Sequence, residues 1–118
     1  MIIAEANRTN ATNWRNHDMS WSDFVATLEQ KFRRTPETMA EYTKMSKSEQ
    51  SAIKSQAGGF VGGQLRGGRR TKENVVCRTM VTLDADYATE NDWGNFTCLY
   101  DGFAVVAYPT HKSTPAKP

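Results

Sequence analysis

The sequence lacks several features that would assign the protein to a particular class. It holds two cysteines, Cys77 and Cys98, which are too few and too far apart for a disulfide framework or a zinc site. No apolar run approaches the roughly 18 residues of a membrane span, and the N-terminus has neither the basic start nor the long apolar core of an export signal. We therefore expect a cytoplasmic protein that is not inserted in a membrane, with both cysteines as reduced thiols in its core.

An excess of charge of one sign is also missing. The formal net charge is +2, which excludes a wholesale acidic mimic of DNA and does not by itself prove nucleic-acid binding. The hydrophobic share of 38% and charged share of 24% are those of a soluble globular protein rather than a disordered one. Because 118 residues suffice for one modest core and no repeat or linker divides them, we expect a single domain over residues 1–118.

Strand and helix patterns follow one another at the start of the chain. Residues 1–6 are apolar enough for a short strand, and Trp14 anchors a second short segment. Ser20 is a good helix cap, and the apolar residues that follow it recur at helical spacing. The pattern predicts a helix over residues 21–32 whose aromatic side packs in the core.

Two further helices are predicted before residue 58. Thr35 followed by a proline is typical of a helix start, so a helix is expected from there to about residue 45. Ser46 and Glu49 have the spacing of a capping box, which predicts a more polar helix that reaches Ala57 and is closed by a glycine.

A glycine-rich and basic segment covers residues 58–72. It ends in a cluster of cations: Arg66, Arg69, Arg70 and Lys72. Its spacing matches neither the Walker loop nor the dinucleotide-binding fingerprint. Gly67 and Gly68 suit a two-residue hairpin turn between a strand at 60–65 and a strand that starts at residue 75. The cations are either solvated at the base of this hairpin or bind the phosphates of a nucleotide or polynucleotide.

An apolar and β-branched run over residues 75–87 ends at Asp84 and Asp86. On a strand, residues two apart share a face, so both carboxylates would be directed at one point. Two hard oxygen ligands suit Mg²⁺ or Mn²⁺. The alternative is that Asp-Ala-Asp simply ends the strand in a turn, where Asp is common.

The last part of the chain predicts a helix, a strand and a tail. A short helix is expected over residues 90–99, and the nearly continuous apolar run at 102–108 is typical of a strand buried on both faces. If this strand lies parallel to the one that ends at Asp84, then His111 reaches the same edge of the sheet. A histidine in a loop can equally be solvated. Residues 112–118 are polar and broken by proline, so we expect a flexible tail.

With these motifs in place, the sequence resembles the N-terminal part of phage and mobile-element replication proteins. These proteins carry a primase-polymerase domain of the archaeo-eukaryotic primase type, often beside virulence-associated helicase modules. The resemblance rests on the ordered series of glycine pairs, basic residues, Thr82-Leu-Asp-Ala-Asp-Tyr87 and Thr110-His111-Lys112. It implies that Asp84 and Asp86 bind a divalent metal and that His111 contacts a nucleotide.

Two departures from that family lead us to expect a catalytically incomplete, truncated primase-like domain. The family's Ser-x-His motif has Pro109 in the place of its serine, and the family's further carboxylate on a later strand has no counterpart here. Two carboxylates are too few to hold and align two metal ions, so the enzyme assignment stays uncertain and leans towards no activity.

Three functions remain open from the sequence. The favoured one is a phage or mobile-element protein that inhibits host nucleic-acid machinery by binding, as anti-CRISPR proteins do, with a nucleic acid or an effector such as a Cas nuclease as its partner in the host cytoplasm. The others are an N-terminal fragment of a metal-dependent primase-polymerase and a nonspecific nucleic-acid-binding module. The expected fold is α+β, with a small mixed sheet of about four strands, the Asp84 and Phe103 strands at its centre and the N-terminal helices packed on one side.

Overall fold

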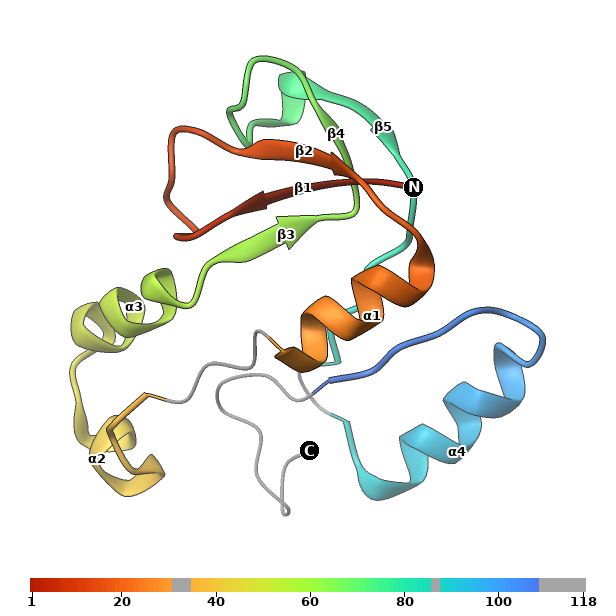
Figure 1. Cartoon of the computed structure of the whole chain (residues 1–118). Helices are drawn as coiled ribbons and strands as arrows, with labels where there is room; N and C mark the ends of the chain where they lie inside the picture. Colours follow the sequence, from red (N-terminus) through yellow and green to blue (C-terminus); the bar gives the residue numbers. More distant parts are fainter. Residues whose placement is uncertain (31–34, 86–87, 109–118) are drawn as a thin grey trace. The chain divides into compact units, whose positions relative to one another are not determined.

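The protein was analysed as a computed structural model, which describes residues 1–30, 35–85 and 88–108 (Figure 1). The chain forms two compact units, Met1–Thr82 and Leu83–Pro118. All the described strands and the helices α1 to α3 belong to the first unit, and α4 belongs to the second. Helices and small sheets thus occur together, and the predicted α+β class is confirmed.

A three-stranded antiparallel sheet forms the centre of the first unit. Strand β1 (Ile2–Ala6) lies between β2 (Arg15–Asp18) and β3 (Gly59–Val61) (Figure 1). The central position of β1 explains why Ile3 and Ala4 are completely buried. The strand expected at the start of the chain is therefore present, in the middle of the sheet.

A second sheet is the hairpin that the glycine-rich segment predicts. Strand β4 (Gly63–Leu65) pairs antiparallel with β5 (Val75–Arg78). The connection is longer than the expected Gly-Gly turn, because Leu65 pairs with Val75 and residues 66–74 form the loop between them. This loop includes a short 3-10 helix, η1 (Lys72–Asn74).

Helix α1 (Trp21–Gln30) packs beside the three-stranded sheet. It lies below the sheet in the view of Figure 1. Its Phe24 is 1% exposed, and the Phe24 ring meets that of Phe60 on β3 edge to face, with 5.0 Å between the ring centroids. The predicted helix is confirmed up to Gln30, and its last two predicted residues lie outside the described part of the chain.

Helix α2 (Met39–Lys44) starts later than the sequence predicts. The Thr38 backbone nitrogen donates to Glu41 Oε2 at 2.8 Å, and the Glu41 nitrogen donates to Thr38 Oγ1 at 3.3 Å. This reciprocal capping box satisfies two of the free N–H groups of the first turn, whereas Thr35 and Pro36 remain outside the helix. The predicted start at Thr35 is therefore wrong.

Helix α3 (Lys47–Gln56) confirms the second capping box. The Ser46 nitrogen donates to Glu49 Oε2 at 2.8 Å, and the Glu49 nitrogen donates to Ser46 Oγ at 3.3 Å. After Ala57 the chain leaves the helix through Gly58, whose φ of 78° lies in the left-handed region that glycine tolerates. A Cβ at Gly58 would also come within 2.7 Å of the Ala6 carbonyl oxygen.

The second unit is built around α4 (Glu90–Leu99), as predicted. A row of aromatic rings runs along this helix and beyond it. The ring centroids are 5.7 Å apart for Trp93 and Phe96, 4.7 Å for Phe96 and Tyr100, and 6.2 Å for Tyr100 and Phe103. Trp93 and Phe103 are nevertheless 54% and 72% exposed. Both rings therefore lie largely at the surface.

Of the two strands expected at the centre of the sheet, the first is formed only as β5 and the second is not formed in the described residues. Strand β5 ends at Arg78, residues 79–85 are not a strand, and neither are residues 102–108. The last pairing partner is Gly62, whose carbonyl accepts from the Thr79 nitrogen at 2.9 Å. Because β4 begins at the next residue, Gly63, the apolar residues that follow Thr79 have no part of β4 to pair with, and Val81 is 83% exposed.

Three smaller observations complete the description. Both sheets are antiparallel, so the expected mixed sheet is a pair of antiparallel ones. Cys77 and Cys98 are exposed and unpaired, so the prediction that they lie in the core is wrong. Within the described ranges, no helix has the length and apolar character that crossing a membrane requires.

Candidate nucleic-acid interface

The loop that carries the predicted cations is held by its own hydrogen bonds. The Arg66 nitrogen donates to the Asn74 carbonyl oxygen at 2.7 Å and closes the loop. Inside it, Asn74 Nδ2 and the Thr71 nitrogen both donate to the Arg69 carbonyl oxygen, at 3.2 and 3.0 Å. We call residues 66–74 the basic loop. These hydrogen bonds fix the loop backbone from which the cationic side chains extend.

The basic loop is also fixed to the three-stranded sheet. Asn16 on β2 uses its side-chain amide as a strand would use its backbone: Nδ2 donates to the Leu65 carbonyl at 2.8 Å, and Oδ1 accepts from the Leu65 nitrogen at 3.0 Å. The Trp14 nitrogen donates to the Gly68 carbonyl at 2.6 Å. Gly68 has a φ of 71°, and a Cβ there would come within 3.2 Å of the Trp14 carbonyl oxygen. Glycine is thus required where the loop touches the sheet.

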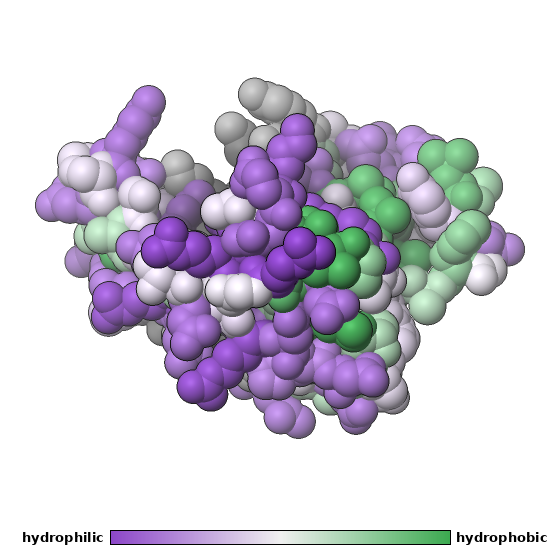
Figure 2. All heavy atoms as spheres, turned by 90° about the horizontal axis from the view of Figure 1, so that it is seen from above, coloured by the Kyte–Doolittle hydropathy of each residue, from purple (hydrophilic) through white to green (hydrophobic). Residues whose placement is uncertain are grey.

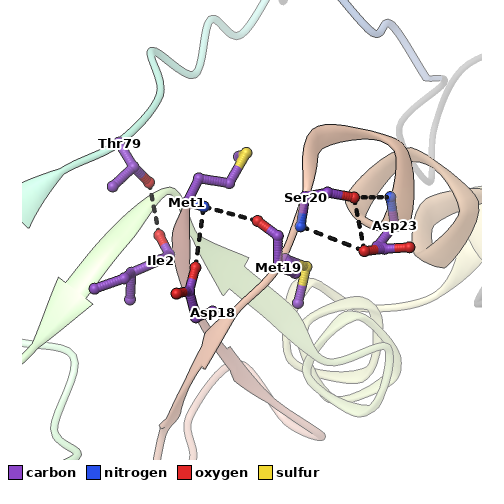
Figure 3. Close-up of polar contacts among 7 residues, drawn as sticks. All are labelled: Met1, Ile2, Asp18, Met19, Ser20, Asp23 and Thr79. Atoms are coloured by element: carbon purple, nitrogen blue, oxygen red, sulfur yellow. Dashed lines mark hydrogen bonds and ion pairs between the residues drawn. The ribbon is translucent and has the colours of Figure 1, made fainter.

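The end of β5 is tied to the first strand of the sheet. Thr79 Oγ1 donates to the Ile2 carbonyl at 2.6 Å (Figure 3). Beside it, the N-terminal ammonium of Met1 donates to the Met19 carbonyl at 2.7 Å and forms an ion pair with Asp18 at 3.1 Å. These contacts hold together the chain start, the end of β2 and the end of β5, so the hairpin that carries the basic loop has two points of support.

Five cations are exposed on this hairpin and its loop. They are the four predicted residues Arg66, Arg69, Arg70 and Lys72, together with Arg78 on β5. Across residues 1–30, 35–85 and 88–108, none of the five forms an ion pair with a carboxylate. Their charges are therefore available to an anionic ligand.

Arg70 is the best positioned of these cations. Its guanidinium carbon lies 5.1 Å from the ring centroid of Trp14, a cation–π contact. Trp14 is itself only 2% exposed, and its Nε1 donates to the Ala11 carbonyl at 2.9 Å. A buried and hydrogen-bonded indole thus orients the Arg70 guanidinium at the surface.

A groove of about 550 Å³ lies beside the basic loop. Its cationic lining comes from Arg70, Lys72 and Arg78, and its apolar lining comes from Phe60, Val61 and Val75. Thr71 and Thr82 add hydroxyl groups. Figure 2, which views the molecule from above, shows mostly hydrophilic residues in purple and some apolar residues in green at the surface. The combination suits a ligand with a negative charge and a flat apolar part.

The residues predicted to bind metal and nucleotide are only partly described. Asp84 is exposed and lies in the segment that is not a strand. Asp86 and His111 lie outside the described residues, as does the expected tail at 112–118. Burial, and secondarily the charge of Asp84, raises the pKa of the Tyr108 hydroxyl above its usual range. The Asp84 charge therefore contributes, after burial, to the electrostatics of the Tyr108 hydroxyl.

The comparison with known proteins assigns the family. The sequence matches the VapE N-terminal domain over residues 1–118. The chain belongs to the VapE N-terminal domain family. This membership confirms the resemblance to the N-terminal part of mobile-element primase-polymerase proteins, and it makes the chain a replication-associated protein of mobile elements. Searches of curated proteins and of solved structures found no match.

The primase resemblance implies a bound metal ion. The described residues of this VapE N-terminal domain do not include all of the implied ligands. Of the implied residues, Asp84 alone is described. Among the described residues, no three side chains of His, Cys, Asp or Glu come together as a metal site. A divalent ion at this site would need Asp86, outside the described residues, beside Asp84, and we derive no chemical step through one.

The sequence of this VapE N-terminal domain predicted the cluster of cations but not the other residues of the groove. The cluster at residues 66–72 was visible as a run of basic residues, but Arg78, Phe60 and Trp14 were missed as parts of the site. A charged residue inside the β-branched run of β5 was the available signal for Arg78, since it indicates an exposed strand face. No sequence signal pairs Trp14 with Arg70, because the contact spans separate elements.

Proposed function

We propose that this protein acts by binding, and that its basic loop and groove engage the phosphates of a nucleic acid. The supporting observation is the set of five exposed cations, unpaired with any described carboxylate, on one ordered hairpin. The net charge is only +2, so this concentration is a local feature rather than a consequence of a basic composition. Local positive charge of this kind attracts phosphate backbones and accelerates association.

The finer proposal is that the bound nucleic acid belongs to host machinery, which the protein inhibits as anti-CRISPR proteins do. Two features support it: membership in a family of mobile-element proteins, and a binding surface on the first unit that includes none of the predicted metal ligands. A guide-bound Cas nuclease is a suitable partner because it presents exposed nucleic acid together with protein.

The test combines capture with a chemical assay. Tagged protein is incubated with Cas nucleases, with and without guide RNA, and the captured proteins are identified, while a parallel reaction measures Mn²⁺-dependent nucleotide incorporation. We expect capture that depends on the guide, loss of capture in the Arg69→Glu/Arg70→Glu variant, retained capture in a Lys47→Glu/Lys54→Glu control on α3, and no incorporation. Capture unaffected by the Arg69/Arg70 reversal would refute the role of the basic loop.

A second candidate is metal-dependent nucleotidyl transfer by Asp84 and Asp86 with His111 at the nucleotide. The family supports it, as does the contribution of the Asp84 charge to the raised pKa of the Tyr108 hydroxyl. Template-dependent incorporation that is lost in Asp84→Ala and kept in Asp101→Ala would establish this candidate and refute a function by binding alone.

A further inference from the structure

We propose that an aromatic pocket of the second unit binds an arginine side chain from a cationic segment of a partner protein. The pocket measures about 250 Å³, and its walls include Asp101 and the rings of Trp93, Phe96, Tyr100 and Phe103. All of these residues lie in Leu83–Pro118. The pocket therefore shares no residue with the basic loop, and the inference goes beyond nucleic-acid binding.

A turn after α4 brings the walls of this pocket together. The Phe103 nitrogen donates to the Tyr100 carbonyl oxygen at 3.1 Å, and Gly102, the third residue of the turn, has a φ of 84°. Glycine is favoured at that position because the left-handed conformation strains other residues. The chain then turns back along the helix (Figure 1), so that Phe103 and Val105 line the same pocket as Trp93 of α4.

The rings of the pocket present aromatic faces in more than one direction. The Trp93 and Phe96 rings are stacked, with 21° between their planes, whereas the Tyr100 and Phe103 rings are nearly perpendicular, at 78°. Trp93, Tyr100 and Phe103 are all exposed, so a ligand can reach them. A cation is attracted to the face of such a ring, most strongly to that of tryptophan.

The charge of this unit favours a cationic ligand. Residues 83–108 contain no lysine, arginine or histidine, and they carry five carboxylates: Asp84, Asp86, Glu90, Asp92 and Asp101. Asp101 is exposed, and it forms no ion pair with any residue that the structure describes. Its carboxylate is therefore available beside the rings, where it would attract a cation and repel a phosphate.

The Asp101 carboxylate also distinguishes arginine from a purely apolar occupant. An apolar side chain that filled the pocket would take this carboxylate out of water without a partner, which is unfavourable. The planar guanidinium of arginine stacks on aromatic rings and donates two parallel hydrogen bonds to a carboxylate. Small-molecule sites typically occupy about 300 to 1,000 Å³, so the smaller volume here suits one side chain.

The experiment adds a short peptide of alternating arginine and leucine to the isotope-labelled wild type and follows the tryptophan indole N–H signals by NMR. The Trp93 signal, assigned with Trp93→Phe, should shift, whereas those of Trp14 and Trp21 in the first unit should not. A peptide with citrulline in place of arginine keeps the shape and loses the charge. It should bind about fivefold more weakly, the effect of one cation–π contact, and a lysine version should also bind more weakly.

Matched variants separate the pocket from general attraction to an acidic unit, with affinity measured by anisotropy of the labelled peptide. Asp101→Asn and Trp93→Leu should each weaken binding of the arginine peptide about two- to fivefold. Asp84→Asn makes the same change of charge, and Tyr108→Leu removes an aromatic ring, both outside the pocket lining. These two variants should bind as the wild type does.

Four results would overturn the proposal. An unmoved Trp93 signal in the wild type would refute the pocket without recourse to any variant. Equal losses in Asp101→Asn and Asp84→Asn would reduce the binding to general attraction. Equal affinity for the arginine and citrulline peptides would remove the role of the cation. Dimerisation of the wild type that Trp93→Leu abolishes would assign the pocket to a second copy of the chain instead of a separate partner.

Discussion

The two units of this chain use apolar residues in opposite ways. Met1–Thr82 encloses a core in which Ile3, Phe24 and Tyr42 are at most 2% exposed, although Val81 near its end is 83% exposed. In Leu83–Pro118 the described apolar residues lie largely at the surface, with Leu99 76% and Phe103 72% exposed. Apolar content alone therefore does not decide burial, which requires elements that pack against one another.

The difference also separates the two sets of predicted site residues. The basic loop lies on the unit whose strands hold it by Asn16, Trp14 and their hydrogen bonds. Asp84 lies at the start of the unit in which no described strand is formed. The geometry that supports a binding function thus belongs to the first unit.

Truncation of a buried aromatic residue should have the largest effect. Phe24→Ala leaves a cavity between α1 and β3, so we expect a loss of about 3 to 5 kcal/mol in the free energy of unfolding. Phe103→Ala removes a ring that is already solvated and should stay within about 0.5 kcal/mol of wild type. Urea unfolding followed by tryptophan fluorescence and circular dichroism measures both. Similar losses for the two variants would show that the units do not differ as described.

Glycine substitutions test the same difference between the two units at the level of the backbone. A Cβ at Gly63 would collide with the Cys77 carbonyl oxygen across the β4–β5 pair, whereas a Cβ at Gly94 in α4 meets nothing within 4 Å. We expect Gly63→Ala to destabilise the protein by about 1 to 3 kcal/mol. Gly94→Ala should instead stabilise α4 by about 0.5 to 1 kcal/mol. Thermal unfolding of both variants checks the opposite signs, and a neutral Gly63→Ala would contradict the tight pairing.

The second unit has its own electrostatic test. Burial and the Asp84 charge both raise the pKa of the Tyr108 hydroxyl, so Asp84→Asn should lower that pKa towards its usual range without reaching it. Ultraviolet titration of tyrosine ionisation measures the change, with Tyr108→Phe to assign the signal. Asp101→Asn, another exposed aspartate of this unit, serves as the control. An unchanged titration in Asp84→Asn would place Asp84 away from Tyr108.

Acid should weaken the helix caps of both units, and this is the smallest effect expected. Hydrogen bonds from the Ser46 side chain and backbone lower the pKa of Glu49, and those from the Thr89 backbone and side chain lower the pKa of Asp92. A lowered folded-state pKa stabilises the native state above the unfolded value of about 4 and ceases to do so as the pH falls through the folded value.

The measurement is circular dichroism of wild type and Glu49→Gln over the acidic range, with Glu29→Gln on α1 as the control. Loss of helix on acidification should be smaller in Glu49→Gln than in wild type or in the control. Identical curves for all three proteins would mean that the Ser46 and Glu49 contact does not contribute.

Local signals in the sequence predicted part of this structure correctly. The capping box of Ser46 and Glu49 involves residues three apart, so its chemistry is complete within the motif, and α3 forms where expected. Local sequence signals likewise predicted the basic cluster and the β4–β5 hairpin. The helix start predicted at Thr35 and Pro36 is wrong because Thr38 and Glu41 form a reciprocal capping box three residues later along the chain.

What the sequence could not predict depends on partners far along the chain. The segments at 79–85 and 102–108 have strand composition, but a strand forms only beside another, and β4 begins at Gly63, opposite Arg78, so it offers no partner to residues 79–85. The groove combines Phe60 of β3 with Arg70 of the basic loop and Arg78 of β5, and no spacing rule relates these positions. The family match supplied the identity, whereas the candidate surface came from the fold.

The most direct test of nucleic-acid binding by the basic loop is the salt dependence of affinity for a single-stranded oligonucleotide. The dissociation constant is measured over a series of salt concentrations for wild type, for the triple variant Arg70→Gln/Lys72→Gln/Arg78→Gln, and for a control of equal charge, Lys44→Gln/Lys47→Gln/Lys54→Gln on α2 and α3. Each phosphate contact contributes about 0.7 to the slope of log affinity against log salt, so the groove variant should lose about 2 from that slope while the control keeps it. An unchanged slope in the groove variant, or an equal loss in the control, would contradict the assignment of this surface.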